Sequence, residues 1–338
     1  MAGPLDHQVG IGVESTWGTP VTPTRFYEWD TDGSEHAYDP KRIQGSGMQP
    51  GGGAFSRADR SVSVVGQSSL TLAMDAQSRG MGLLLKAALG VGTSTLVGGT
   101  TYQQLFSTGM TGALLDALTV QYGIVRSDTG GTVDAYTYPG CTVTGLELAC
   151  SAGDIVKAKF ELDGQPPATG TALATASYPA LVAPFHFGQG AVGMGGTLTL
   201  PTTTTLASGL TAVTSVREAT LNLDNAANTE RWRFGGRNQP RTAKRSAKIK
   251  LTIENDATTI RDALLNHTTI PLTITFTSSE ALSTGNATLQ IVAPACKIPD
   301  GSFPQPSADS VYDVEFDVLQ PASGQALYVV LRTADTAL

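Results

Sequence analysis

The chain repeats one pattern of residues, and this repetition constrains its fold more than any other feature. A strand-like run at 70–76 (Leu-Thr-Leu-Ala-Met-Asp-Ala) recurs at 251–257 (Leu-Thr-Ile-Glu-Asn-Asp-Ala). Each run leads into a helix-like segment that ends in Leu-Leu, at 83–84 and at 264–265. The offset is 181 residues for both landmarks, 251 against 70 and 264 against 83. Such spacing indicates a duplicated domain, because solenoid repeats span only about 20–50 residues.

A second echo follows each copy. Pro-Gly-Cys at 139–141 precedes an alternating run at 156–162, and Pro-Ala-Cys at 294–296 precedes a similar run at 312–318. The offset here is 155 residues, 296 against 141, so the first copy carries about 26 extra residues, which we place at 90–115. The alternative is that two β-rich halves share turn chemistry by chance.

Composition and patterning predict an all-β fold with minor helix. Charged residues make up 15% of the 338 residues and there are 38 glycines, which is typical of a β-rich protein with many turns. The expected architecture is two tandem β-sandwich or half-barrel domains, each with one flanking α-helix, at 1–166 and 185–338 with a linker at 167–184. The strand-like runs are 61–73, 141–150, 154–163, 214–223, 248–254, 270–277, 286–293, 311–319 and 326–332.

Two helices and two long loops complete this prediction. Asp75 is expected to N-cap a helix that runs to about Leu89 and stops at Gly90, and Asp256 to cap its counterpart, which ends near Asn266. Residues 30–60 and 224–245 show no regular pattern and occupy equivalent places before the first echoed strand. Loops of this length are uncommon in compact domains, which suggests a function for both.

The sequence carries no arrangement typical of catalysis. The four histidines are scattered without metal-ligand spacing, and Gly-Gln-Gly-Ala-Val-Gly at 188–193 precedes strand-like sequence where a dinucleotide site needs a helix. A net charge of −7 argues against general affinity for nucleic acid. We therefore expect no enzyme, cofactor or metal site. The polar start and lack of a long apolar run predict a cytoplasmic origin without membrane contact, with three reduced cysteines.

The N-terminal run at 11–26, Ile-Gly-Val-Glu-Ser-Thr-Trp-Gly-Thr-Pro-Val-Thr-Pro-Thr-Arg-Phe, resembles the opening of major tail tube proteins of phages with long, non-contractile tails. The resemblance implies a structural virion protein, assembled in the host cytoplasm, whose stacked rings form a hollow tube that conducts genomic DNA. It also implies contact with a tape measure protein in the lumen during assembly, with tail terminator and tip proteins, and with passing double-stranded DNA that is not specifically bound.

Two tube-type domains in one chain alter the expected symmetry. Simple members of the family have one domain and form six-membered rings, so three copies of this chain would complete a ring. We therefore predict homotrimeric, pseudo-sixfold rings, with homohexameric rings as the alternative.

Acidic side chains on the echoed strands are expected to line the tube. One side of each strand is apolar, which suits packing, and the other is polar, which suits a wet channel. An acidic lining would repel phosphate and let DNA slide. The alternative is a sheet face open to bulk solvent. The expected lining residues are Glu161, Asp163, Asp313, Glu315 and Asp317.

The two long loops carry opposite charge, acidic in the first and basic in the second. We expect them to contact the neighbouring ring, with Trp232 and Phe234 providing the contact and Arg237 and Arg241 selecting the docking angle. Simple solvated loops and contact with DNA are the alternatives. A function from another class, a two-domain carbohydrate-binding or adhesin-like β-sandwich protein, predicts an export signal and clustered exposed aromatics.

Overall fold

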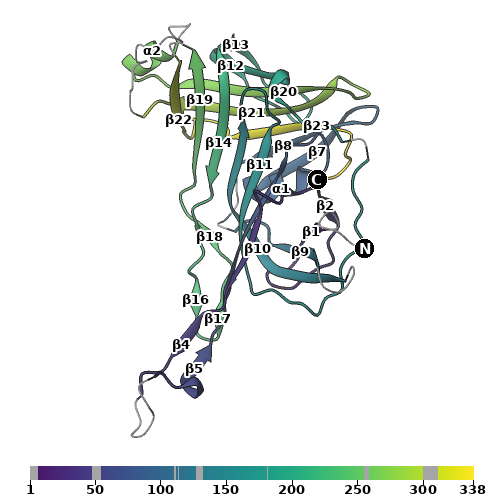
Figure 1. Cartoon of the computed structure of the whole chain (residues 1–338). Coiled ribbons are helices and arrows are strands. Elements are labelled where there is room, and N and C mark those ends of the chain that lie inside the picture. The colour runs from purple at the N-terminus through teal and green to yellow at the C-terminus, as the bar shows by residue number, and fades with distance from the viewer. Residues whose placement is uncertain are drawn as a thin grey trace.

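The structure is a computed structural model in which a large antiparallel sheet forms the body and narrow ribbons extend from one end (Figure 1). It describes residues 7–47, 55–109, 112, 114–126, 132–180, 182–254, 259–299 and 311–338. Strands dominate this part of the chain, together with two α-helices. The prediction of a mostly β fold with minor helix is thus confirmed.

Strands from the first part of the chain form one continuous antiparallel series. Its members, in order across the sheet, are β3 (Glu35–Asp39), β6 (Gln67–Asp75), β11 (Lys157–Gly164), β10 (Val133–Cys150), β9 (Leu118–Val125), β1 (Gln8–Val13) and β2 (Arg25–Tyr27).

Strands from the second part form a series with the same order of connections. Its members are β14 (Val216–Asp224), β19 (Ser246–Glu254), β22 (Val311–Val318), β21 (Asn286–Lys297), β20 (Ile270–Ala281), β12 (Gly190–Thr199) and β13 (Ser208–Val213). Each member occupies the place of its counterpart in the first series: β19 corresponds to β6, β22 to β11, and β21 to β10.

The two series are joined directly. The C-terminal part of β10 pairs with β14, from Gly145 opposite Asp224 to Cys150 opposite Ala219. A second junction uses β23 (Tyr328–Thr333), which pairs with β21 on one side and with β8 (Thr101–Ser107) on the other. The hairpin of β7 (Val91–Gly98) and β8 falls in the segment at 90–115 that the sequence indicates as extra in the first copy.

Each series also carries one helix, and each follows the equivalent strand. Helix α1 (Gly82–Leu89) comes after β6, and α2 (Thr259–Leu265) comes after β19. Gly90 ends α1 with a φ of 101°, a left-handed conformation that favours glycine, and its N–H donates to Lys86 O at 2.7 Å. The predicted cap at Asp75 is wrong: this residue ends β6, and its carboxylate binds Lys157 Nζ at 2.8 Å. Asp256, the other predicted cap, lies outside the described residues.

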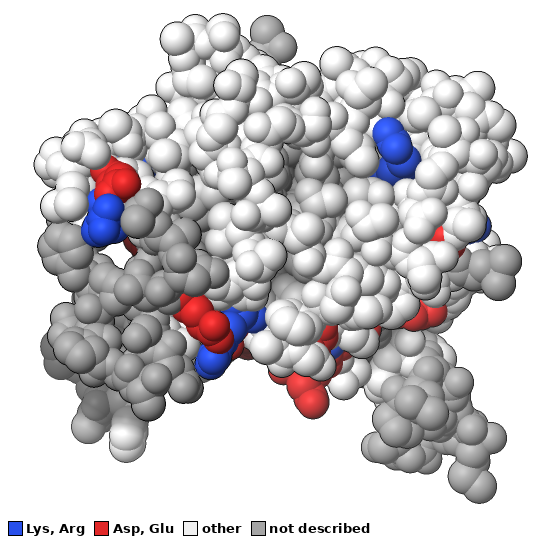
Figure 2. All heavy atoms as spheres, turned by 90° about the horizontal axis from the view of Figure 1, so that it is seen from above, with Lys and Arg blue, Asp and Glu red and all other residues white. Residues whose placement is uncertain are grey.

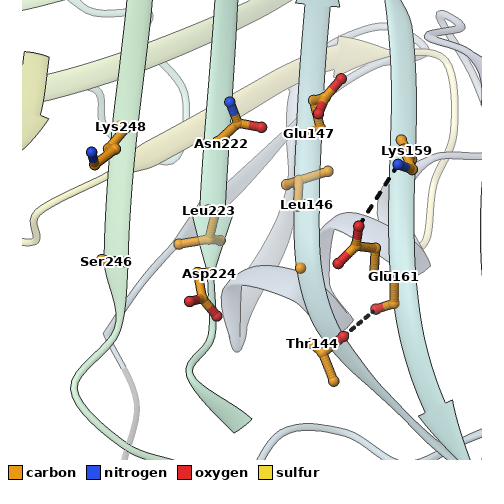
Figure 3. A pocket seen from close by; sticks show the side chains of 11 residues that line it. Thr144, Leu146, Glu147, Lys159, Glu161, Asn222, Leu223, Asp224, Ser246 and Lys248 are labelled. Atoms are coloured by element: carbon orange, nitrogen blue, oxygen red, sulfur yellow. Dashed lines mark hydrogen bonds and ion pairs between the residues drawn. The ribbon is translucent and has the colours of Figure 1, made fainter. Parts of the chain in front are cut away.

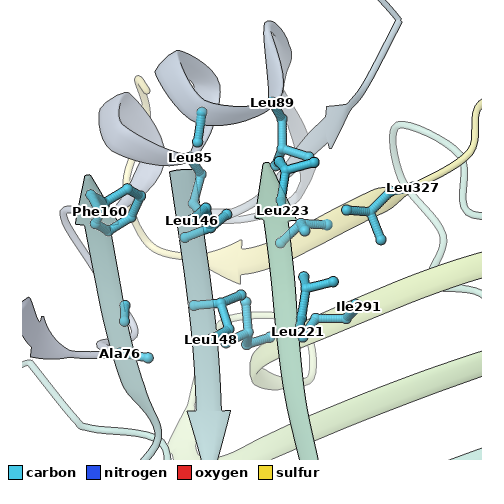
Figure 4. Close-up of a cluster of buried hydrophobic side chains, with 14 of the residues drawn as sticks. Ala76, Leu85, Leu89, Leu146, Leu148, Phe160, Leu221, Leu223, Ile291 and Leu327 are labelled. Carbon is cyan, nitrogen blue, oxygen red and sulfur yellow. The ribbon is translucent and has the colours of Figure 1, made fainter. Parts of the chain in front are cut away.

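Part of the core lies between the apolar face of the sheet and α1. Seven of the eight residues of α1 are buried, because only Lys86 interrupts its apolar surface. Leu85 and Leu89 of the helix lie over Leu146, Phe160 and Leu223 of three neighbouring strands (Figure 4). The helix therefore covers strands from both series.

The two long loops form the ribbons that extend below the body in Figure 1. Strand β3 belongs to the body, whereas β4 (Arg42–Gln44) of the first loop forms a ribbon with β5 (Ser61–Ser63), the start of the predicted strand at 61–73. The second forms β15 (Ala227–Asn228) with β18 (Arg241–Thr242), and β16 (Trp232–Arg233) with β17 (Gly236–Arg237). We call the described residues 42–47 and 55–63 the first arm and residues 226–244 the second arm.

Candidate functional site

The polar face of the main sheet gathers most of the predicted channel residues. Strands β6, β11, β10, β14, β19 and β22 lie side by side, and alternate residues along them point away from the core. In Figure 2, charged side chains gather along the lower edge of the molecule while the surface seen from above is mostly uncharged. Acids outnumber bases on the polar face. The acids are Asp75, Glu147, Glu161, Glu218, Asp224, Glu254, Asp313, Glu315 and Asp317, and the bases are Lys157, Lys159, Arg217, Lys248 and Lys250.

Of the five acids predicted to line the channel, three are paired with a lysine on the same sheet. Glu315 accepts from Lys248 Nζ at 2.6 Å, and Asp313 lies 2.5 Å from Lys250 Nζ. Hydrogen bonds from Lys250 and Thr252 lower the pKa of Asp313, and the bond to Glu315 raises the pKa of Lys248. All of these side chains stay about half exposed, so each pair contributes little stability.

Glu161 shows the same arrangement on the first series, 3.7 Å from Lys159 Nζ. The face is therefore a mixed-charge surface with an acidic excess, rather than an uninterrupted acidic one. The alternation of Lys248 and Lys250 on β19 is the sequence signal for these pairs, because it matches the alternation of the acids on β22.

A shallow hollow of about 390 Å³ lies on this face between β11, β10, β14 and β19. Glu147, Lys159, Glu161, Asp224 and Lys248 line it, and Figure 3 shows them on neighbouring strands around an open centre. Within the described residues, no group of three or more His, Cys, Asp or Glu side chains is arranged to hold a metal ion. The hollow is a polar depression in a charged wall.

The structure places Asp163 and Arg237 together inside the protein. Each is only 4% exposed, and they form an ion pair between β11 and the β16–β17 hairpin of the second arm. Arg237 also donates to Gly164 O at 3.1 Å and to Thr229 O, while Gln67 Nε2 donates to Asp163 at 2.7 Å. Burial raises the pKa of the Asp163 carboxyl, and Arg237 acts against that rise.

This pair differs from what the sequence predicts for both residues. In the single chain, Asp163 presents no carboxylate to a channel and Arg237 presents no guanidinium to a neighbouring ring, because each neutralises the other. Asp163 and Arg237 instead attach the second arm to β11.

The remaining arm residues stay at the surface. Trp232 donates to Glu230 at 2.6 Å, and Lys41, just before the first arm, lies 4.4 Å from the centre of its ring. Lys41 also pairs with Glu230 at 3.5 Å, so the two loops contact one another within the chain. Phe234, at the tip of the second arm, is fully exposed, and Arg241 is exposed on β18.

Two residues that sequence reasoning did not single out attach the second series to α1. The Asn225 amide donates to Ala88 O at 3.0 Å and to Val143 O at 2.9 Å. Arg245 donates to Leu89 O at 2.9 Å and to Ala88 O at 2.8 Å, where a cation also favours the helix C-terminus. Burial lowers the pKa of Arg245 to about 10. These residues flank the second arm, so they fix both of its ends to the body.

The sheet thus has one charged face and one buried face, and two arms project from it. The chain belongs to the phage tail tube protein family, whose model matches residues 4–318. It is therefore a structural component of the phage tail in the virion and not an enzyme. No curated protein matches its sequence.

Membership in this family implies that the chain polymerises with itself. None of the helices in the described ranges is long and apolar enough to cross a membrane.

Proposed function

We propose that three copies of this chain form a pseudo-sixfold ring, and that stacked rings form the tube of a long, non-contractile tail. In this proposal residues 1–166 and 185–338 are two tail-tube domains joined by a linker at 167–184. The observation that carries the proposal is the repeated strand order, in which seven strands of each part occupy equivalent places.

The junction between the two series supports the ring. Strand β14 pairs with β19 on one side and with β10 of the first series on the other. Its counterpart β3 pairs with β6 alone among the described residues, so its other edge is open. An open edge offers unpaired backbone groups to another strand. Within the chain, β14 pairs with a strand of the other series, β10. In a ring, the open edge of β3 would pair in the same way with a strand of the next copy.

The expected ring therefore has three chains and six similar outer lobes. Image reconstruction of purified tubes should show threefold rings with a sixfold-like outline. Mass measurement of isolated rings should give three times the chain mass of 35.1 kDa. Six chains in a ring would overturn the trimer and favour homohexameric rings, while leaving the tube itself intact.

The polar face of the main sheet is proposed to line the channel, with Glu161, Asp313, Glu315 and Asp317 among its acids. The tape measure protein would occupy this lumen during assembly, and double-stranded DNA would later pass through it without specific binding. Tail terminator and tip proteins would close the two ends. The acidic excess supports this role, because phosphate repulsion reduces adhesion of DNA to a narrow wall.

Reversing the charge at Glu161 and Glu315 to Lys should leave tubes intact but slow DNA release. Both side chains are exposed, so the fold tolerates the change, whereas added cations attract phosphate along the channel. Release can be followed by dye fluorescence in phage that carry the variant at several salt concentrations. Glu161→Gln with Glu315→Gln is the matched control and should change release much less. Release at the normal rate in the Lys variant would place these carboxylates away from the channel.

A further inference from the structure

An apolar groove lies at the end of the body opposite the arms. It has a volume of about 370 Å³ and is formed where β12, β14 and β20 meet the short turn at 187–189. Its apolar lining consists of Phe187, Val192, Val213, Val216, Ile274 and Phe276. Phe187 is 40% exposed, although its ring is apolar. Such exposed apolar surface is characteristic of an interaction site.

The second arm carries an apolar group of matching character. Phe234 is fully exposed at the tip of the β16–β17 hairpin, where its ring touches no core. Phe234 and Gly235 form the two-residue hairpin turn, and Gly235 has a φ of 83°. An exposed aromatic ring on a narrow hairpin contributes nothing to folding but provides a large apolar contact to a partner.

The groove and the hairpin lie at opposite ends of one strand. Val216, Arg217 and Glu218 at the start of β14 line the groove, and Asp224 at its end leads into the second arm. Figure 1 shows β12 and β13 at the upper end and β16 and β17 far below them. A copy displaced along the direction of β14 therefore brings its hairpin toward the groove of the next copy. Contacts between unlike surfaces of this kind produce open, stacked polymers.

Charge at the two surfaces is complementary. Arg233, next to Phe234, is exposed and has no ion-pair partner within the described residues, and Glu218 at the groove is in the same situation. The neighbouring Arg217 already pairs with Glu254 at 2.8 Å, and Lys250, which interacts electrostatically with Glu218, forms its ion pair with Asp313. The surface seen from above in Figure 2 is otherwise poor in charge, so an apolar contact there meets little desolvation cost.

We infer that Phe234 of one copy inserts into this groove of a copy in the next ring, with Arg233 facing Glu218. The inference rests on the proposed stacking of rings and adds the surface on which the second arm docks. The occupant of the groove is a second copy of the chain, because the family polymerises and the hairpin carries both the aromatic ring and the opposite charge.

Removal of the Phe234 aromatic side chain tests the apolar contact. Phe234→Ala should raise the concentration needed for tube formation by about tenfold or more, since burial of a Phe side chain is lost at every inter-ring contact. Leu96→Ala is the matched control, because Leu96 is a 50% exposed apolar side chain on β7, outside both arms and the groove. Sedimentation and negative-stain microscopy report the assembly, and circular dichroism confirms that both variants are folded. Equal assembly of the two variants would overturn the inference.

Crosslinking tests the identity of the partner surface. Phe234→Cys with Thr214→Cys, made in a Cys150→Ala background, should form disulfides in assembled tubes, because Thr214 is exposed at the groove. Under non-reducing conditions the products should extend beyond the number of chains in one ring. Leu96→Cys with Thr214→Cys is the control pair and should remain uncrosslinked, because Leu96 lies on β7, outside both arms.

Each outcome separates this inference from the proposed function. A ladder that stops at the size of one ring would assign the contact to neighbours within that ring and overturn the inference. Tubes that form without any crosslink to position 214 would do the same while leaving the tube intact. Failure of the unmodified chain to form rings or tubes would instead count against the proposed function. Exchange of charge in Arg233→Glu with Glu218→Lys should restore assembly that either single variant loses.

Discussion

Replacing Arg237 by Met is expected to lower the free energy of unfolding by about 3–5 kcal/mol. The change leaves the Asp163 carboxylate 4% exposed without its charged partner, and it also removes the donors to Gly164 O and Thr229 O. Gln67 alone then faces the carboxylate with one hydrogen bond. Denaturant unfolding followed by circular dichroism, with the variant and the unmodified chain at the same pH, measures the difference.

Two further variants separate charge burial from a general effect of altering the second arm. Arg241→Met removes an exposed arginine from the same arm and should change stability by no more than about 0.5 kcal/mol. Asp163→Leu combined with Arg237→Met removes both charges, and it should recover much of the loss because no unpaired ion remains inside. Equal stability of the Met variants at 237 and 241 would show that the buried pair does not anchor the arm.

This anchoring also alters how effects of Arg237 on ring stacking should be interpreted. The side chain is buried against β11 although it belongs to the same hairpin as Phe234, so its loss would disturb stacking by freeing that hairpin. Phe234 and Arg233, by contrast, lie at the tip and contribute no support to the fold. Stability and assembly measurements on the two groups of residues therefore distinguish a positioning role from direct contact.

The main strands were accessible from sequence because their signals are local, and so was the repeated residue pattern that predicts a duplication. Alternation along β6, β11, β19 and β22 exposes one face and buries the other, and each such run is visible within a few residues. Strand β9 lacks this alternation because both of its faces are covered, with six consecutive buried residues, and it was not predicted. The pairs in the arms are only two or three residues long, too short for any periodic signal.

The candidate site was less predictable because its key contacts join distant residues. Asp163 and Arg237 are 74 positions apart, and nothing local distinguishes them from the exposed acids and arginines beside them. Lys248 and Glu315 are 67 positions apart, so their pairing follows only from the register between β19 and β22. Sequence pattern thus placed Glu161, Asp313, Glu315 and Asp317 on polar strand faces, but it could not show which charges are neutralised.

Phe160→Ala and Phe316→Ala should each lower the free energy of unfolding by about 3–5 kcal/mol. Both rings are 0% exposed, and both lie on equivalent strands of the repeated series. Phe160 is paired with Leu72 of β6, and Phe316 with Ile249 of β19, so each loss leaves a cavity in a comparable place. Calorimetry and denaturant unfolding give the size of the change, and Phe55→Ala, at a 91% exposed position, provides the baseline.

The number of steps in the thermal unfolding of these variants is as informative as the change in their free energy of unfolding. Strands β10 and β14 join the two series through six paired residues, and Asn225 and Arg245 bind the end of α1 from the second series. A cavity in either series should therefore lower the melting temperature of the whole chain in one cooperative step, because neither series keeps its contacts when the other unfolds. If Phe316→Ala instead produces an early partial transition while the remainder melts at its original temperature, the two parts are stable separately and the junction contributes little.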